Sequence, residues 1–225
     1  ILPKLFKYIN ENKKKKIMEI QNKALELSLF LSIPASIALL LASEEIISAL
    51  FGYGSFGEIG VKNSAKALFY FGLGLPAFSL IKVFSSFFFA RHNTKTPFYI
   101  SFISILLNII ISIYYFHSVG FIIIPIATTI SSWFNSILLF IFLKKKNFFN
   151  FNMIFVNRFI RILISAVIMG LFFNYLTIFF ESNLTYEQTY KSVYIISIVL
   201  FGLFFYLLIA ILIKAFKISD INLKY

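Results

Sequence analysis

The chain has 225 residues, of which 60% are hydrophobic and only 13% are charged, and its mean hydropathy is +0.88. A soluble domain needs a polar exterior, which this composition cannot supply. The net charge of +12 would suggest a nucleic-acid partner in a soluble protein, but Lys and Arg also collect on the cytoplasmic side of membrane helices. The absence of cysteine excludes disulfides and thiolate metal sites. We therefore expect an all-α integral membrane protein that binds no nucleic acid.

The chain opens with a polar segment, residues 1–26, which contains four consecutive lysines, Lys13 to Lys16. From Ile17 onward, apolar residues recur at helical spacing, which is typical of an interfacial amphipathic helix. Apolar stretches of membrane-spanning length follow, so we expect about six transmembrane helices. They lie at 27–50, 65–90, 98–117, 120–143, 159–180 and 192–214.

Alternating the connections across the membrane gives a strong charge bias. Lys62, Lys66 and Lys191 fall on one side, Lys82 lies within a span, and the other 17 of the 21 Lys and Arg fall on the opposite side. The positive-inside rule then places both termini in the cytoplasm. The expected segments are a cytoplasmic connection (1–26), a four-helix part (27–143), a basic cytoplasmic linker (144–158), and two last helices with a short cytoplasmic tail (159–225).

Polar residues form stripes on several of the expected spans. One span carries Ser101, Ser104, Asn108 and Ser112 at spacings of three and four, and the next carries Thr128, Ser131, Ser132 and Asn135 in similar register. Lipid tails cannot form hydrogen bonds with these groups, so the groups should face other helices or a hydrated cavity. The two last spans have weaker stripes, which predicts that they are the more lipid-exposed ones.

Lys82 is the one charged residue deep in a span, on the same helix face as Ser79 and Ser86. A cation at the centre of a bilayer costs about 2.5–3.5 kcal/mol even on lenient insertion scales. Two interpretations remain open: Lys82 is an anchor that snorkels to the cytoplasmic interface, or it attracts an anion in an aqueous cavity.

Pro34, Pro76 and Pro125 all fall inside expected spans. A proline removes a backbone hydrogen bond and bends its helix, so these three residues are candidate hinges. Broken helices are common in transporters that alternate between two states.

Motifs for catalysis are absent from the sequence. It has no phosphate-binding Gly-Lys-Ser/Thr loop, no His-Glu-x-x-His and no Gly-x-Ser-x-Gly. An enzyme is not expected, and neither is a cofactor.

A block of motifs resembles a known family. Leu50-Phe-Gly-Tyr-Gly-Ser-Phe56, Tyr70-Phe-Gly-Leu-Gly-Leu-Pro76, Lys82-Val and Phe89-Ala-Arg-His-Asn-Thr-Lys-Thr-Pro97 occur in this order. Together they are similar to the C-terminal half of the MurJ (MviN) lipid II flippases, relatives of the MATE exporters and polysaccharide flippases. The resemblance runs from the end of the eighth of fourteen helices to the C-terminus, and its most specific part is 70–97.

The resemblance implies one lobe of a fourteen-helix MATE-like transporter of the bacterial cytoplasmic membrane, without the N-terminal lobe. Such a protein would move a lipid-linked anionic substrate, lipid II, across the bilayer by alternating access. On this basis Lys82, Ser79, Ser86 and Asn108 are candidates for the substrate cavity. Arg91, Lys95 and Pro97 would form a cytoplasmic turn that moves during closure.

Two departures from the family limit the resemblance. The functionally decisive arginines of the family lie in parts that this chain lacks, so the chain alone is not expected to flip lipid. Some relatives hold a sodium ion near the positions of Asn108 and Thr128, but Ser112 stands where they have an acid, so we predict no metal site. Two alternatives remain: an exporter of another lipid-linked saccharide or a drug, and a membrane scaffold that transports nothing.

Overall fold

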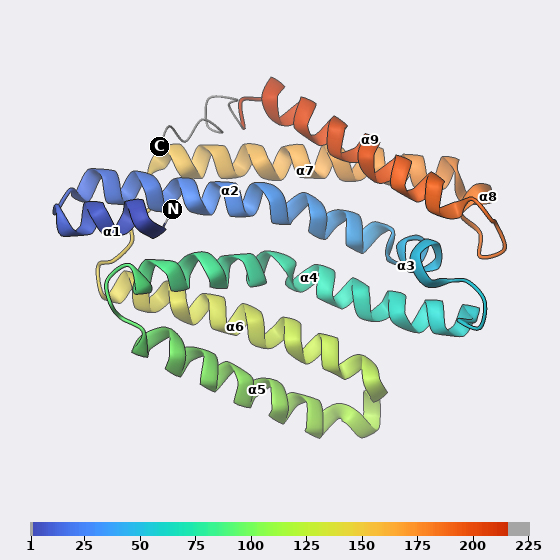
Figure 1. Ribbon diagram of the computed structural model, residues 1–225, viewed down its shortest axis with the longest axis horizontal. Helices are drawn as coiled ribbons and strands as arrows, with labels where there is room; N and C mark the ends of the chain where they lie inside the picture. Colours follow the sequence, from blue (N-terminus) through green and yellow to red (C-terminus); the bar gives the residue numbers. More distant parts are fainter. Residues whose placement is uncertain (1, 216–225) are drawn as a thin grey trace. The chain divides into compact units, whose positions relative to one another are not determined.

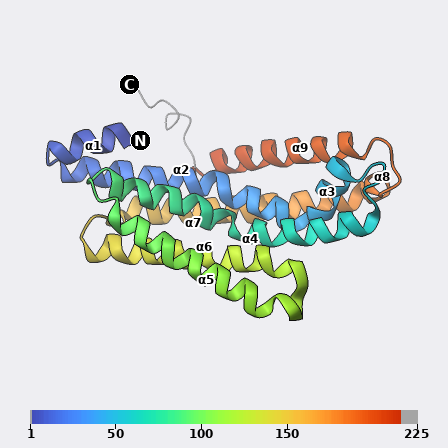
Figure 2. The same cartoon turned by 60° about the horizontal axis from the view of Figure 1, so that its bottom comes forward.

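The computed structural model describes residues 2–215, and its regular secondary structure in this range is entirely helical. Figures 1 and 2 show the long helices and their short connections. The elements are α1 (Leu2–Asn10), α2 (Lys14–Leu41), α3 (Ser43–Phe51), α4 (Glu58–Phe89), α5 (Lys95–Val119), the 3-10 turn η1 (Gly120–Ile122), α6 (Ile123–Lys145), α7 (Met153–Phe179), α8 (Glu181–Leu184) and α9 (Lys191–Leu212). The prediction of an all-α fold is confirmed.

Five stretches of the described chain are long and apolar enough to cross a membrane, whereas six spans were expected. The difference lies in residues 95–145, a continuous helical stretch of 51 residues. At Gly120 this stretch turns back on itself, so that α5 and α6 pack as a hairpin (Figures 1 and 2). Gly120 has φ +72°, a conformation that costs a glycine nothing. With 25 and 23 residues, α5 and α6 are each long enough to span a bilayer.

The first expected span, 27–50, was placed wrongly. A single helix, α2, already begins at Lys14 and ends at Leu41, and the remainder forms the separate helix α3. Ala42 breaks the helix with φ −133° and ψ 35°. Glu44 and Glu45 then lie in the first turn of α3, where negative side chains complement the helix dipole and favour a new start.

The described chain forms two compact units, each built from segments that are distant in sequence. Unit 1 combines the residues up to 32 with 74–157, and unit 2 combines 33–73 with the residues from 158 onward. The helices α2, α4 and α7 each contribute to both units, so the units do not coincide with the segments expected from the sequence.

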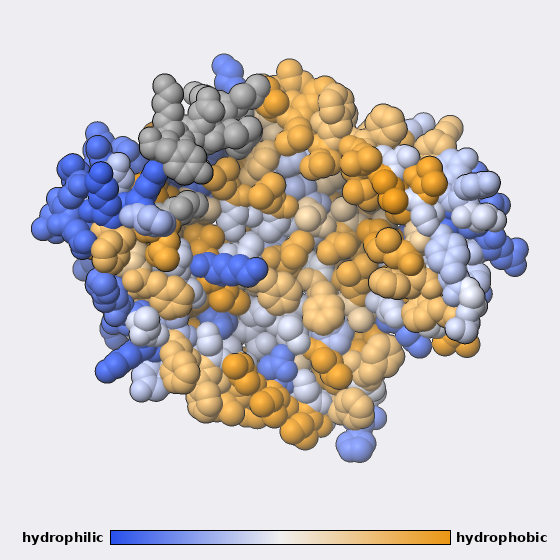
Figure 3. Space-filling model, viewed as in Figure 1, coloured by the Kyte–Doolittle hydropathy of each residue, from blue (hydrophilic) through white to orange (hydrophobic). Residues whose placement is uncertain are grey.

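Unit 1 has an aromatic core at the end of α4. Phe87 and Phe149 stack with ring centroids 5.8 Å apart, and both side chains are almost completely buried. Phe84, Phe140 and Phe151 surround them with edge-on or tilted contacts. Aromatic contacts of this kind fix the linker between α6 and α7 against the end of α4. On the face seen in Figure 3, hydrophilic residues gather over α1 and the first turns of α2.

Of the long helices in the described chain, α5 is the least buried. Three of its 25 residues are buried, compared with nine of the 23 residues of α6 and six of the 22 residues of α9. The expectation that α7 and α9 would be the more exposed helices is therefore wrong with respect to α5, whereas α6 is more buried than α9, as expected. Polar side chains of α5 bond to α6, which leaves the apolar sides of α5 uncovered.

A hydrogen bond within unit 2 compensates for the backbone donor that α4 lacks at Pro76. Because proline lacks an N–H, the carbonyl of Gly72, four residues earlier, loses its helical donor. The hydroxyl of Ser36 on α2 donates to this carbonyl at 2.7 Å. A Cβ at Gly72 would lie 3.1 Å from Cβ of Leu39, so the glycine also allows this close approach. A neighbouring helix thus satisfies the carbonyl that Pro76 leaves without a partner.

Unit 2 also buries a lysine at the start of α9. Lys191 is 1% exposed, and its Nζ donates to the carbonyls of Gly52 at 2.8 Å and Tyr186 at 2.6 Å. The rings of Tyr53 and Tyr186 each lie 4.5 Å from the same nitrogen. Cation–π contacts of a desolvated ammonium stabilise it further. This arrangement, the Lys191 cage, ties the loop after α3 to the loop before α9.

We predict that Ser36→Ala lowers the free energy of unfolding by about 0.5–1.5 kcal/mol, because the Gly72 carbonyl loses its donor in a non-aqueous interior. Thermal unfolding in detergent measures the change. Ser197→Ala is the matched control, since the half-buried Ser197 donates to the carbonyl of Val193 in its own helix. Equal losses in the two variants would contradict this compensation at Pro76.

We predict that Lys191→Met costs about 2–4 kcal/mol, because methionine fills a similar volume but leaves two carbonyls without a donor. Lys62→Met serves as the control: Lys62 lies in the same unit, but it forms an exposed ion pair with Glu58 on one helix, which stabilises little. Unfolding midpoints that fall equally in both variants would show that the cage adds nothing.

Candidate functional site

The candidate site begins on the uncovered face of α4 in unit 1. Lys82 is exposed, while Ser79 and Ser86 on the same face are half-buried. The opposite face, with Phe84, Phe87 and Phe88, is buried in unit 1. The sequence pattern predicted this shared face, and the structure leaves Lys82 on it exposed.

The two serines on this face do not hold helices together. The hydroxyl of Ser79 donates to the carbonyl of Pro76 at 2.9 Å, and that of Ser86 donates to the carbonyl of Val83 at 2.7 Å. Both bonds stay within α4. These two bonds therefore give no support to the packing interpretation of this stripe, and a role toward water or a ligand stays a prediction.

In the polar stripes of α5 and α6 the asparagines bond across to the other helix, whereas the hydroxyls of Ser104, Ser131 and Ser132 also donate within their own helices. The Asn108 amide nitrogen donates to Thr128 Oγ1 at 3.1 Å and to Ser131 Oγ at 3.2 Å. Asn135 donates to Ser101 Oγ at 3.4 Å in the same interface. These contacts join the two helices of the hairpin, so they give Asn108 a packing role and do not place it in a cavity.

The turn between α4 and α5 is fixed by Arg91. Its guanidinium donates to the carbonyls of Phe87 and Phe148, each at 2.8 Å, and lies 4.6 Å from the centre of the Phe148 ring. Burial lowers the pKa of Arg91. Lys95 is the exposed first residue of α5, and Pro97 is buried in the first turn, where a proline costs little helical hydrogen bonding. The proposed motion of this turn stays a prediction.

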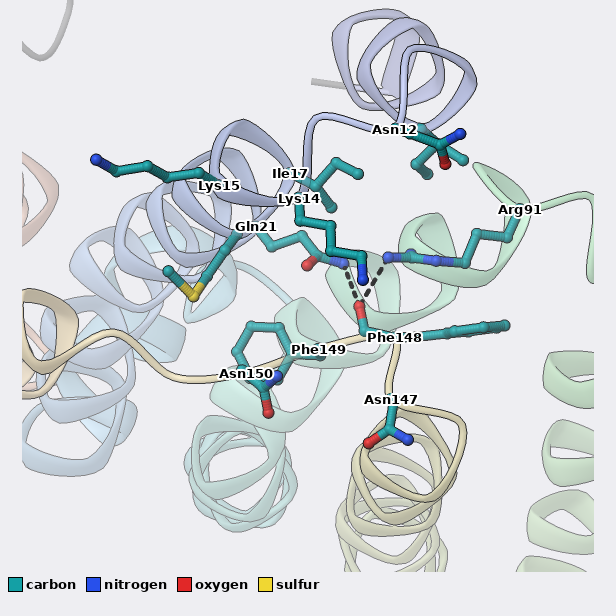
Figure 4. A pocket seen from close by; sticks show the side chains of 12 residues that line it. Asn12, Lys14, Lys15, Ile17, Gln21, Arg91, Asn147, Phe148, Phe149 and Asn150 are labelled. Atoms are coloured by element: carbon teal, nitrogen blue, oxygen red, sulfur yellow. Dashed lines mark hydrogen bonds between the residues drawn. The ribbon is translucent and has the colours of Figure 1, made fainter.

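A cavity of about 560 Å³ opens beside Arg91 in unit 1. Figure 4 shows Lys14, Gln21 and Arg91 pointing toward the carbonyl oxygen of Phe148, whereas Lys15 extends away. The side-chain amide of Gln21 donates to this oxygen at 2.9 Å, so that one carbonyl accepts from both Gln21 and Arg91. We call this cavity the basic pocket. Its remaining walls are Ile9, Asn12, Ile17, Met18, Asn147, Phe149 and Asn150.

The three candidate hinge prolines fall at different kinds of position. Pro34 lies inside α2, two residues after position 32, where unit 1 ends in this helix. Pro76 lies inside α4, three residues after position 73, where unit 2 ends in this helix. Pro125 is the third residue of α6. Pro125 removes no helical hydrogen bond there, because first-turn N–H groups have no intrahelical acceptor, and its role as a hinge stays a prediction.

A second cavity, of about 330 Å³, is acidic and lies in unit 2. Glu44, Glu45, Glu58 and Glu181 line it. Burial raises the pKa of Glu45, and the neighbouring carboxylates of Glu44 and Glu181 raise it further. Among residues 2–215, no three His, Asp or Glu side chains are arranged to hold a metal ion.

A family model described as "Lipid II flippase MurJ" matches residues 1–183. The chain belongs to this family. A solved structure titled "Lipid II flippase MurJ, inward closed conformation" superposes with a TM-score of 0.74 at 26% identity, over 95% of this chain and 42% of that one. The resemblance inferred from the motifs is confirmed.

Curated MurJ relatives match over much of the chain. A "Probable lipid II flippase MurJ" of Rhizobium tropici is 34% identical over 76% of this chain and 32% of its own length. One from Thermotoga maritima is 32% identical over 86% of this chain and 37% of its own length. The chain thus spans about a third of the length of these relatives. Membership of the MurJ family and the apolar helices make it part of a multi-pass protein of the bacterial inner membrane.

Sequence reasoning missed two features of this MurJ-family chain. Lys191 was assigned only to a polar connection, because its burial depends on the loop around Tyr53, far away in sequence. Gln21 was taken only as part of an amphipathic segment, yet it is 1% exposed and binds the linker carbonyl. In the sequence, the only signal for Gln21 was an amide side chain between the lysine run and the first apolar span.

We predict that Asn108→Leu destabilises the α5–α6 hairpin by about 0.6–1.7 kcal/mol, the range found for interhelical hydrogen bonds in membranes. Ser112→Ala is the control, because the Ser112 bond to Asn108 is long, at 3.5 Å. Thermal unfolding with both variants measures the difference. If the unfolding midpoint of Asn108→Leu is as high as that of Ser112→Ala, Asn108 has no packing role in the hairpin.

Proposed function

We propose that this chain is the C-terminal part of a lipid II flippase. In the complete protein, undecaprenyl-pyrophosphate-linked peptidoglycan precursor would move from the inner to the outer leaflet by alternating access. The protein would be a transporter and not an enzyme. Family membership supports this proposal, and the uncovered α4 face carries the residue-level part of it.

A hydrated α4 face is favoured by the free-energy cost of the alternative, a cation in contact with lipid. Lys82 is exposed on this face, and lipid contact at that depth is expensive for a cation. The hydroxyls of Ser79 and Ser86 are already satisfied within α4, so they can meet water at no further cost. A pyrophosphate-bearing headgroup needs such a wet, positively charged wall, whereas its lipid tail can stay in the bilayer. Lys82 is therefore assigned to the wall of the substrate cavity, which the rest of the full-length protein would complete.

Orientation follows from the same charge bias that the sequence shows. The ends of α2, α4 and α6 near the basic pocket carry Lys13 to Lys16, Arg91 and Lys144 to Lys146, and we place them in the cytoplasm. The loops with the acidic cavity and the Lys191 cage would then face outward. The C-terminal lysines Lys217 and Lys224, which support the cytoplasmic placement of the C-terminus, lie outside the described residues.

The alternatives differ in what the α4 face would contact. A membrane scaffold would have no use for an exposed cation inside a span, so it predicts lipid or protein contact. An exporter of another lipid-linked saccharide or of a drug predicts the same wet face with a different ligand. Competition binding to the full-length protein with lipid II and with such compounds separates these two transporters.

We predict that Lys82→Ala in the full-length protein lowers the rate of lipid II flipping by about tenfold, the lower end of what a focusing charge contributes. Lys82→Arg should retain most of the activity because it keeps the charge. Lys62→Ala, which removes an exposed cation at the other end of α4, is the control. Flipping in reconstituted vesicles is the measurement, and unchanged flipping by Lys82→Ala would remove the assigned role.

Water access to the face is a separate prediction. The chain has no cysteine, so Ser79→Cys and Lys82→Cys each introduce one thiol into this part of the protein. Both should react with a membrane-impermeant thiol reagent much faster than Leu200→Cys, an exposed apolar position of α9. Rates as slow as at position 200 would place the face in lipid and contradict the transport proposal.

A further inference from the structure

The basic pocket has a composition that fits neither a packing defect nor a surface charge cluster. Lys14, Lys15 and Arg91 line it, and no Asp or Glu does. Among the residues that the structure describes, none of these three cations forms an ion pair. Yet Arg91 is half-buried, where an uncompensated charge is costly.

The side chains around the pocket are arranged to donate hydrogen bonds. Arg91 uses two of its five N–H groups on the carbonyls of Phe87 and Phe148, so donors remain. Lys14 and Arg91 both point toward the Phe148 carbonyl (Figure 4), although two cations repel each other unless an anion lies between them. Asn12, Asn147 and Asn150 add amide donors to the rim.

The backbone at the start of α2 also favours an anion in the pocket. Lys14 opens a helix of 28 residues whose first turn contains three lysines and no acid. Positive side chains at a helix N-terminus oppose its dipole, and a bound anion would reverse this unfavourable interaction.

The walls of the pocket also restrict the identity of the anion. Ile9, Ile17, Met18 and Phe149 form an apolar side. The pocket lies where α2 begins and where α4 and α6 end, at the level of the phosphates of a bilayer that these helices would span. Basic pockets between membrane helices at this level typically bind phosphate headgroups.

We propose that the basic pocket binds a phosphate group, with Lys14 and Arg91 as its cationic ligands and Gln21 holding the Phe148 carbonyl in place. The apolar wall favours a phosphate carried by a membrane lipid over free phosphate. This binding does not require the proposed transport, and it concerns an opening of unit 1 other than the α4 face.

The test uses the full-length protein and Lys14→Gln/Lys15→Gln, which removes two charges of the pocket from exposed positions. The control is Lys7→Gln/Lys16→Gln, which removes two charges from the same segment but from residues that do not line the pocket. Native mass spectrometry compares retention of phosphatidylglycerol with that of phosphatidylcholine, and a separate titration uses inorganic pyrophosphate.

We expect the pocket variant to weaken retention of phosphatidylglycerol about tenfold, and the control variant to change it less than twofold. A loss confined to pyrophosphate binding would support the pocket with a soluble phosphate as its ligand. Equal behaviour of the two variants in both assays, with unchanged unfolding midpoints, would overturn the proposal. Because the readout is binding, a failure here leaves the flipping assay of Lys82 unaffected.

Discussion

Inside a bilayer, a polar side chain must find its hydrogen-bond partner within its own helix, on a neighbouring helix or in water. This constraint separates the stripes that looked alike in the sequence. Asn108 finds partners on α6, and Ser36 supplies the donor that Pro76 denies to Gly72. Ser79 and Ser86 turn to their own helix and leave Lys82 on an uncovered face. The interpretation of the α4 face as a cavity wall depends on this difference.

The sequence allowed the fold class, the two spans that form the hairpin and the family to be predicted, because these depend on local patterns. Apolar length defines the spans, and the spacing around Asn108 placed its stripe on one helix face. The break at Ala42 was missed because alanine is a good helix former, although Ser43, Glu44 and Glu45 directly after it are residues that favour a helix start. The position of Pro125 in the first turn of its helix was also not predicted, because periodicity does not reveal the residue at which a helix begins.

The site was only partly predictable, for a different reason. Arg91 stood out in the turn after α4, but its partner is the backbone of Phe148, which no side-chain pattern reveals. Burial of Gln21 and Lys191 likewise depends on loops that are more than 100 residues away in sequence. Contacts to carbonyls leave no trace in residue types, so the sequence could name the cations but not what holds them.

The division of α2, α4 and α7 between two units has a consequence for biosynthesis. Unit 1 needs both the residues up to 32 and the segment 74–157, and unit 2 needs both 33–73 and the last helices. The earliest helix must therefore wait in the membrane while later ones emerge from the ribosome, and neither unit can close as a contiguous nascent stretch. In each unit, the two segments can therefore meet only after an intervening segment of the other unit has been inserted.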